Sequence, residues 1–467
     1  MTMRSCLSIV LAAGLGTRMK SDLPKVMHEI GGLPLVGHVV KALEQAGSDR
    51  ISVVTGPAMS ELEALVHDIA PGVSCHVQEE RLGTAHAALA ARPALETAAE
   101  DVLVLFGDTP LVTAETIGAV RKSLEEGADV AVLGFETRHP FGYGRLLTKN
   151  GRLVAIREEK DATDEERRIT LCNSGIMGFR GSQALALLEA IGNENIKGEY
   201  YLTDAVEIAN ARGLTVVAVA GEEVETQGIN TRAQLASCEA DYQARMRRAA
   251  LENGCTLLAP DTVFFSHDTH LEPDVTVEQN VVFGPGVRVS KGARIRAFSH
   301  LEGAVVGEGS VVGPYARLRP GAVLGAETRI GNFVEVKNAT FAPGAKANHL
   351  SYIGDASVGS KSNIGAGTIT CNYDGFLKHR TEIGAGSFVG SSSTLVAPVS
   401  LGDDVFIAAG SVITEDVPHG ALAFGRARQV VKDGKAVQLK TRLKSAKEAA
   451  REAKGQSAGD AARDAKS

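Results

Sequence analysis

Two hydrophobic patterns divide the 467-residue chain at about residue 254. Before this point, short apolar runs alternate with amphipathic segments, which predicts a mostly parallel sheet with helices on both faces. The predicted strands are 7–13, 51–55, 102–106 and 131–135, and the predicted helices include 35–45 and 59–69. A sheet of this kind binds ligands at the carboxyl ends of its strands, and Gly14 and Asp108 lie just past two such ends.

In the second half an apolar residue recurs at almost every sixth position. The recurring residues are Val277, Phe283, Val289, Ile295, Leu301, Val306, Val312, Leu318, Leu324, Ile330, Val336, Val358, Ile364, Ile383, Val389, Leu395, Leu401, Ile407 and Ile413. A period of six fits neither a helix nor a hairpin meander. It predicts a parallel β-helix with three flat sides, in which each side points one aliphatic group inward and small residues turn the corners. The series breaks at 338–355 and 372–380, where loops are expected to leave the wall.

Segments of different character flank the repeat. Residues 231–253 are charged, lack Gly and Pro and end at Gly254, which predicts a connecting helix. The chain is therefore expected to have an α/β domain at 1–230, a linker helix at 231–253, a β-helix domain at 254–431 and a Lys/Ala-rich tail at 432–467. In the tail, 439–454 can be helical, and 455–467 are expected to be frayed or disordered.

Composition and charge exclude several classes of function. Lys and Arg total 49 against 56 for Asp and Glu, and this net charge of −7, with no long basic run before the tail, argues against a nucleic-acid partner. The hydrophobic (44%) and charged (22%) fractions argue against a disordered chain or a membrane protein. Six irregularly spaced cysteines without a CxxC pair indicate a reducing compartment. Because the apolar run 7–13 is short and enters a Gly-rich turn, it indicates a buried strand rather than a signal peptide, and a cytoplasmic location is expected.

Residues 11–25 carry the first chemical signal. Gly14 and Gly16 allow backbone N–H groups to surround an anion, and Arg18 and Lys25 can neutralise a triphosphate. The spacing matches neither a P-loop nor a dinucleotide-binding fingerprint. Beside such a turn, the carboxylate of Asp108 suits Mg²⁺, and a helix N-cap is its alternative role.

The segment 11–26, LAAGLGTRMKSDLPKV, resembles the signature of sugar-nucleotide pyrophosphorylases. Since it is joined to a hexapeptide repeat, nearly the whole chain except the tail resembles the family of bifunctional N-acetylglucosamine-1-phosphate uridyltransferases and glucosamine-1-phosphate acetyltransferases. The resemblance implies a Rossmann-like α/β nucleotidyltransferase domain followed by a left-handed parallel β-helix. It also implies a cytoplasmic homotrimer that makes UDP-N-acetylglucosamine for peptidoglycan and lipopolysaccharide, with active sites between β-helix subunits.

For uridyl transfer, the resemblance implies that Asp108 and Asn230 hold Mg²⁺. The implied contacts to UTP and UDP-N-acetylglucosamine are Leu11, Ala12, Ala13, Gly14, Arg18, Lys25, Gln78, Gly83, Thr84, Gly144, Glu158, Asn173 and Asn230. In the family, the positions of Gln78, Gly83 and Thr84 bind the base, and those of Gly144, Glu158 and Asn173 bind the sugar. Without the family, Gln78 would be interpreted as a surface residue. The phosphate nucleophile needs no general base, so catalysis would be orientation plus charge neutralisation.

For acetyl transfer, the resemblance implies that His349 is the general base, a role that suits an imidazole near neutral pH. The implied contacts to glucosamine-1-phosphate are Arg319, Lys337, Tyr352 and Asn363, and those to acetyl-CoA are Ala366, Asn372, Tyr373, Ser391, Ala409 and Arg426. His349 falls in the first break of the repeat and is expected on a loop, where a merely solvated histidine is the alternative. Arg319 and Lys337 are one 18-residue coil apart and are expected on the same wall, with a solvent-facing basic ladder as the alternative.

Two other functions stay open at this point. One is a single-activity sugar-nucleotide pyrophosphorylase whose β-helix is regulatory or oligomerising. The other is a non-catalytic assembly scaffold. The set of Arg319, Lys337, His349 and Tyr352 argues against the first, and Asp108 beside the phosphate-binding turn argues against the second.

Overall fold

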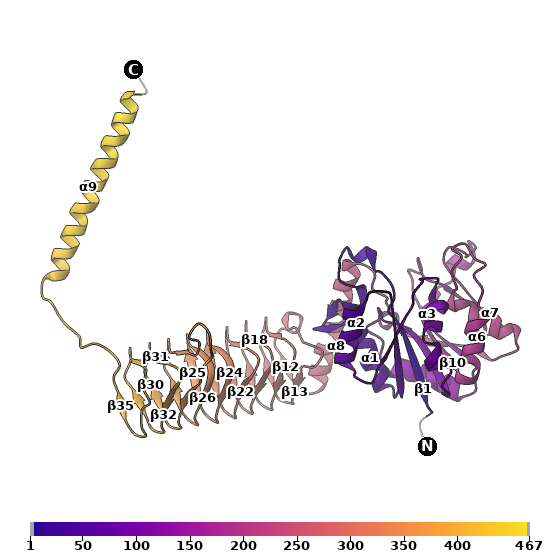
Figure 1. Ribbon diagram of the computed structural model, residues 1–467, viewed down its shortest axis with the longest axis horizontal. Coiled ribbons are helices and arrows are strands. Elements are labelled where there is room, and N and C mark those ends of the chain that lie inside the picture. Colours follow the sequence, from indigo (N-terminus) through magenta and orange to yellow (C-terminus); the bar gives the residue numbers. More distant parts are fainter. Residues whose placement is uncertain (1–3, 465–467) are drawn as a thin grey trace.

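The computed structural model describes residues 4–464, which form an α/β domain, a long β-helix and a C-terminal helix in chain order (Figure 1). The α/β domain lies at one end of the β-helix, and the C-terminal helix extends away from the coils at the other end (Figure 1). No helix in the described part of the chain is long and apolar enough to cross a membrane.

The α/β domain is built on a nine-stranded sheet with the order β11-β7-β10-β6-β1-β4-β5, to which the β8–β9 hairpin is attached. Its strands are β1 Cys6–Leu11, β4 Arg50–Thr55, β5 Ser74–Val77, β6 Asp101–Phe106, β7 Val130–Glu136, β8 Arg145–Lys149, β9 Arg152–Arg157, β10 Leu171–Arg180 and β11 Val216–Gly221. β1 is parallel to both neighbours, β4 and β6, while β10 runs antiparallel to β6 and β7. The predicted mostly parallel sheet is therefore confirmed.

The helices of this domain cover the sheet. They are α1 Leu35–Gln45, α2 Ser60–Ile69, α3 Thr84–Ala90, α4 Arg92–Leu95, α5 Ala114–Glu125, α6 Gly181–Glu189 and α7 Ala205–Ala211. Apolar side chains of β1 alternate between two separate cores, because successive residues of a strand point to opposite faces. Leu7, Ile9 and Leu11 pack with α3, α6 and α7, whereas Cys6 and Val10 pack with α1, α2 and α5.

The linker region joins the two domains through a small hairpin. Helix α8 spans Arg232–Glu252, and the hairpin consists of β2 Glu29–Ile30 and β3 Leu33–Pro34. At the hairpin turn, Gly31 donates its N–H to Glu239 of α8 over 2.8 Å and accepts hydrogen bonds from Ser266 and His267 of the β-helix at 3.0 and 2.8 Å. The junction is therefore a hydrogen-bonded contact of three segments.

The second half is a three-sided parallel β-helix. The first wall contains β12 Thr256–Leu257, β14 Thr276–Val277, β17 Arg294–Ile295, β20 Val311–Val312, β23 Arg329–Asn332, β25 Lys346–His349, β27 Asn363–Ile364, β30 Phe388–Val389, β33 Phe406–Ile407 and β35 Leu422–Ala423. The second wall contains β13 His270–Leu271, β16 Arg288–Val289, β19 Ala304–Val306, β22 Ala322–Leu324, β29 Thr381–Ile383 and β32 Val399–Leu401. The third wall contains β15 Val282–Phe283, β18 His300–Leu301, β21 Arg317–Leu318, β28 Ile369–Cys371, β31 Thr394–Val396 and β34 Val412–Ile413.

Two longer strands, β24 Glu335–Phe341 and β26 Tyr352–Val358, pair with both the second and the third wall and so bend around the corner between them. The residues of the predicted six-residue series fill one continuous core. Coils also form earlier than the series predicted, since Leu257 and Leu271 already point into this core.

The first predicted break, 338–355, is wrong: the coil is continuous there. Phe341, Ala347 and Ile353 take the inward positions, reached from Val336 in steps of five, six and six residues. The six-residue period was not recognised in the sequence because one step is a residue short and because the small Ala347 occupies an inward position. His349 therefore ends strand β25 and does not lie on a loop. The second break is a loop: residues 372–380 leave the wall between β28 and β29 and close through a bridge between Tyr373 and Lys378.

The expectation for the end of the tail is also wrong over most of its length. Helix α9 spans Lys435–Asp464, so the frayed segment expected at 455–467 continues the helix to residue 464, and 465–467 lie outside the described residues. The sequence there contains four alanines and only two glycines after residue 454, and Ala has the highest helix propensity.

Candidate functional sites

The phosphate-binding turn follows β1 directly, at the carboxyl edge of the sheet. Gly14 has open space where a side chain would begin, and Gly16 has φ +62° and packs against Lys25. A cavity of about 340 Å³ lies over this turn. Its lining includes Leu11, Ala12, Ala13, Gly14, Lys25, Gln78, Arg81, Gly83, Thr84 and Asp108. The structure thus brings together the turn and the predicted base-binding residues around one cavity.

Two oxygen-bearing side chains, Asp108 and Asn230, and two cations, Lys25 and Arg18, meet where this cavity adjoins a second one. Asp108 follows β6, and Asn230 precedes Thr231, the N-cap of α8. The Lys25 ammonium forms an ion pair with the Asp108 carboxylate and donates to Asn230 Oδ1 over 3.1 Å. Arg18 donates to the same amide oxygen over 2.8 Å. Asp108 is not a helix cap, because the next helix, α5, is capped by Thr113.

The predicted sugar-binding residues line a second cavity of about 590 Å³, which shares Thr84, Phe106, Asp108 and Glu199 with the first. Gly144 and Asn173 are joined by a backbone hydrogen bond of 2.8 Å, and Glu158 lies beside Gly144. Burial raises the pKa of Glu158, with a smaller opposing effect of Lys197. A carboxyl group beside a polar pocket can form hydrogen bonds with sugar hydroxyls.

On the β-helix, the register of the coils brings the predicted glucosamine-1-phosphate contacts together. Leu318 pairs with Val336, so Arg319 and Lys337 occupy successive coils of the third wall, and Tyr352 follows on the next coil. Arg319 also donates to Glu335 over 2.9 Å. Asn363 lies on the first wall, one coil beyond β25, which ends at His349.

His349 lies at the corner between the first and third walls, here called the His349 corner. Its Nδ1 lies 2.6 Å from Oδ1 of Asn332 on the preceding coil. With Nδ1–H donating to that oxygen, Nε2 carries the free lone pair, which is the form of a general base. Sequence reasoning missed Asn332, although its spacing of 17 residues from His349 is one coil.

The predicted acetyl-CoA contacts continue along the same corner. Gly367 donates to the His349 carbonyl over 3.3 Å, Ser392 to Ala366 over 2.7 Å and Gly410 to Ser391 over 2.8 Å. Ala409 precedes Gly410, and Arg426 packs near Gly410. Small residues thus form a line from His349 to the last coil. Asn372 lies apart from this line on the 372–380 loop, where it donates to Asp355, and Tyr373 follows it.

The structure adds Lys378, which the sequence did not single out. Lys378 belongs to the 372–380 loop and lies beside Lys337. The ammonium of Lys378, followed by the guanidinium of Arg319, lowers the pKa of Lys337. Three cations in mutual repulsion favour an anion between them. A loop outside the repeat offers no periodic signal by which Lys378 could have been found.

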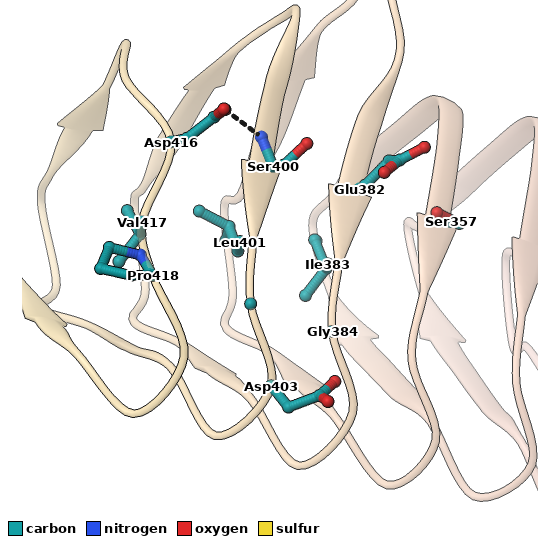
Figure 2. Close-up of a pocket in the computed structure, with 11 residues that line it drawn as sticks. Ser357, Glu382, Ile383, Gly384, Ser400, Leu401, Asp403, Asp416, Val417 and Pro418 are labelled. Atoms are coloured by element: carbon teal, nitrogen blue, oxygen red, sulfur yellow. Dashed lines mark hydrogen bonds between the residues drawn. The ribbon is translucent and has the colours of Figure 1, made fainter.

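A further concavity, of about 680 Å³, lies on the second wall near the end of the β-helix (Figure 2). Two of its three acidic side chains already serve the fold: Asp416 accepts from the Ser400 backbone over 2.7 Å (Figure 2). Asp403 accepts from the Ala385 backbone over 2.6 Å. None of the predicted site residues lines it.

Comparisons with known proteins agree with both halves of the chain. Residues 8–170 match the family model of the MobA-like NTP transferase domain, residues 303–338 match bacterial transferase hexapeptide repeats, and residues 380–415 match the hexapeptide repeat of succinyl-transferase. Over 440 residues the chain is 60% identical to the bifunctional protein GlmU of Azorhizobium caulinodans, covering 94% of this chain and 98% of the relative. The proteins of the same name from Bartonella quintana and Agrobacterium fabrum are 54% and 55% identical, each over 98% of its length and over 94% and 95% of this chain.

The chain belongs to the GlmU family. The predicted fold, a nucleotidyltransferase domain followed by a left-handed parallel β-helix, is confirmed. The predicted bifunctional enzyme, a uridyltransferase and an acetyltransferase in one chain, is confirmed as well. A single-activity pyrophosphorylase or a non-catalytic scaffold is not supported.

Proposed function

We propose that the β-helix acetylates glucosamine-1-phosphate with acetyl-CoA and that the α/β domain then joins the product to UMP from UTP. UDP-N-acetylglucosamine made in this way would supply peptidoglycan and lipopolysaccharide synthesis. The observation that carries the proposal is that the residues implied for each reaction gather at two separate places. One set surrounds the cavities at Asp108, and the other follows the His349 corner.

In the α/β domain, the sugar phosphate would lie in the cavity of Glu158 and Asn173, and UTP in the cavity of the phosphate-binding turn. A phosphate oxygen attacks the α-phosphorus in line, the new P–O bond forms and pyrophosphate leaves with the electron pair. Lys25 and Arg18 neutralise the charge of the triphosphate, and the backbone of the turn orients it.

The residues present fit Mg²⁺. The carboxylate of Asp108 and the amide oxygen of Asn230 converge on one cationic group, the Lys25 ammonium, and hard oxygen ligands beside a phosphate site are what Mg²⁺ requires. We assign Asp108 and Asn230 as its ligands. Bound there, Mg²⁺ supplies further neutralisation of phosphate charge.

In the β-helix, Arg319, Lys337 and Lys378 would hold the sugar phosphate, with Tyr352 and Asn363 beside it. Nε2 of His349 removes a proton from the amine as its nitrogen attacks the thioester carbonyl. The C–S bond then breaks, and the proton is returned to the thiolate of coenzyme A. Acetyl-CoA would lie along the small residues of the corner, from Ala366 to Arg426, with Asn372 and Tyr373 on the adjacent loop.

We also propose that the enzyme is a homotrimer. Phe298, Tyr315 and Phe333 form an exposed stack on the His349 corner, with ring centroids 4.8 and 5.3 Å apart, and Leu350 continues it on the next coil. Exposed apolar stacks of this kind mark interaction surfaces. A second copy of the chain would cover the stack and complete the adjoining site.

All six cysteines are free thiols, which supports a cytoplasmic location.

Two assays on one preparation test the proposal. Pyrophosphate release is measured with UTP and N-acetylglucosamine-1-phosphate, and thiol release with acetyl-CoA and glucosamine-1-phosphate. His349→Ala should reduce thiol release by about 10²- to 10⁴-fold and leave pyrophosphate release unchanged. Asp108→Ala should do the reverse. If either substitution removed both activities from folded protein, the assignment of two independent sites would be wrong.

A further inference from the structure

The side chain of Gln78 is held in one orientation by two contacts. Its exposed fraction is 4%, and its Nε2 lies 3.2 Å from the Gly83 carbonyl oxygen and 3.1 Å from Nδ1 of His86. A carbonyl oxygen can only accept, so the amide NH₂ must face Gly83. Its other hydrogen then points at His86, whose Nδ1 must accept it. This fixes His86 as a neutral ring with its hydrogen on Nε2.

Because the amide NH₂ is used by Gly83 and His86, the amide oxygen, Oε1, is free to accept a hydrogen bond from a ligand in the cavity. Oε1 has no hydrogen-bond partner among residues 4–464, and Gln78 lines the cavity of the phosphate-binding turn. Gln78 therefore presents an acceptor and no donor to whatever binds there. Because the side chain is almost fully buried, a ligand that offers no donor at this point leaves a polar atom unpaired, which is costly.

The two groups that orient Gln78 are themselves fixed. Tyr200 donates its N–H to the Leu82 carbonyl over 2.8 Å, and Ala85 donates to the Tyr200 carbonyl over 3.0 Å. Gly83 has φ +119°, and a Cβ there would lie 2.5 Å from the Tyr200 oxygen, so only glycine fits. The ring of His86 lies 6.2 Å from the Tyr200 ring. The frame around Gln78 is therefore rigid.

We propose that His86 is a positioning residue that, together with the Gly83 carbonyl, orients Gln78 so that the site selects uracil over cytosine. The inference rests on the proposed binding of UTP. Uracil carries a single ring donor, N3–H, which matches an acceptor. A cytosine in the same pose presents the N3 lone pair at that point and faces another lone pair. Discrimination of this type is strong because the site is built to bond one partner.

The test compares two substitutions of His86 on the full-length protein. His86→Phe keeps a ring beside Tyr200 but has no acceptor, and His86→Asn can return an acceptor oxygen near the position of Nδ1. Steady-state uridyl transfer is measured with UTP, CTP and 5-methyl-UTP, which retains N3–H. His67→Phe, an exposed position on α2, is the matched control.

In His86→Phe the preference for UTP over CTP in kcat/KM should fall about three- to tenfold, through the KM of the nucleotide, because one hydrogen bond no longer holds the amide. His86→Asn should restore most of the preference, and 5-methyl-UTP should follow UTP throughout. An unchanged ratio in His86→Phe, or a loss that His86→Asn does not recover, would overturn the inference.

Failure of the proposed function would look different. Wild-type protein would then turn over none of the three nucleotides. Turnover of UTP by each His86 variant shows that its α/β domain is folded, and thiol release from acetyl-CoA shows the same only for the β-helix, which has a separate core. If His86→Phe shows the wild-type preference for UTP over CTP in kcat/KM, the positioning role of His86 is contradicted, but the proposed uridyl transfer is not.

Discussion

The two sites differ in how completely a single chain encloses them. In the α/β domain, loops after β1, β5 and β6 converge with the start of α8 around two cavities, and Lys25 and Asp108 are 13% and 15% exposed. On the β-helix, His349 is exposed at a corner and Arg319 is only half-buried. A layered fold surrounds a ligand because strand ends meet at one edge, whereas the wall of a solenoid is flat and offers residues only in a line.

This difference suggests that the β-helix site depends on other copies of the chain and the α/β site does not. The two regions are nevertheless joined firmly at Gly31. A change at the His349 corner should therefore act on acetyl transfer alone, and a change at the junction should act on the stability of the joined domains.

The largest expected effect comes from the aromatic stack. Phe333→Glu places a charge on a surface that we expect another subunit to cover, so assembly should be lost. Thiol release should then fall at least about 100-fold, because a displacement of about 1 Å in a reacting pair already costs that much. Pyrophosphate release should be unchanged. Light scattering after gel filtration and the two assays measure these outcomes.

Phe264→Glu serves as the control, because Phe264 is 45% exposed but lies away from the His349 corner on the first coils. It should keep the assembly and both activities. If Phe333→Glu remained assembled, or dissociated with full thiol release, the contrast between a self-sufficient site and a shared one would fail.

The next effect concerns the junction. Burial lowers the pKa of His38 to about 4, with smaller contributions from His267 and Lys41 that also lower it and from backbone acceptors that raise it. Below about pH 6.5 the imidazole of an unfolded chain binds a proton, whereas His38 in the folded protein stays neutral. The folded protein is therefore fully stable above about pH 6.5 and loses stability as the pH falls toward 4. When the pH is lowered from 7.5 to 5, the titration of His38 should reduce the free energy of unfolding by about 2 kcal/mol. This corresponds to roughly a thirtyfold change in the unfolding equilibrium.

His38→Gln keeps a donor for the Ile30 carbonyl, which His38 Nε2 reaches at 2.9 Å, but does not titrate. Urea unfolding of both proteins at pH 7.5 and 5 should show a smaller loss of stability for the variant. The same loss in both proteins would mean that acid acts elsewhere, for example on His28 or His267, whose pKa values burial also lowers.

A smaller effect is expected at Lys378. Lys378→Met removes one of three cations around the proposed phosphate position, and a charge-assisted hydrogen bond to phosphate is lost. The KM for glucosamine-1-phosphate should rise about tenfold, with little change in kcat or in the KM for acetyl-CoA. Lys361→Met, an exposed lysine on the same β-helix, is the control. Equal effects of the two variants would assign Lys378 a general electrostatic role only.

These residues also mark the limit of what the sequence could predict. Periodicity identified the β-helix because each coil needs an apolar residue at each inward position, and Asp108 was found because it ends an apolar run. The period was lost where Ala347 fills an inward position, which misplaced His349 onto a loop. Asn332, Lys378 and His86 act through contacts between separate coils, loops or turns, and such contacts leave no local pattern.

The smallest expected effect tests whether the α/β site is as self-contained as the comparison requires. Arg81 donates from Nε to the Ala13 carbonyl over 2.7 Å and so ties the base-binding loop to the phosphate-binding turn. Arg81→Leu should raise the KM for UTP about fivefold, the value of one hydrogen bond, and leave thiol release unchanged. Arg92→Leu, which breaks only exposed ion pairs with Glu96 and Glu189, should change neither activity. A fall in thiol release in Arg81→Leu would mean that the turn communicates with the β-helix, and the two sites would then not be independent.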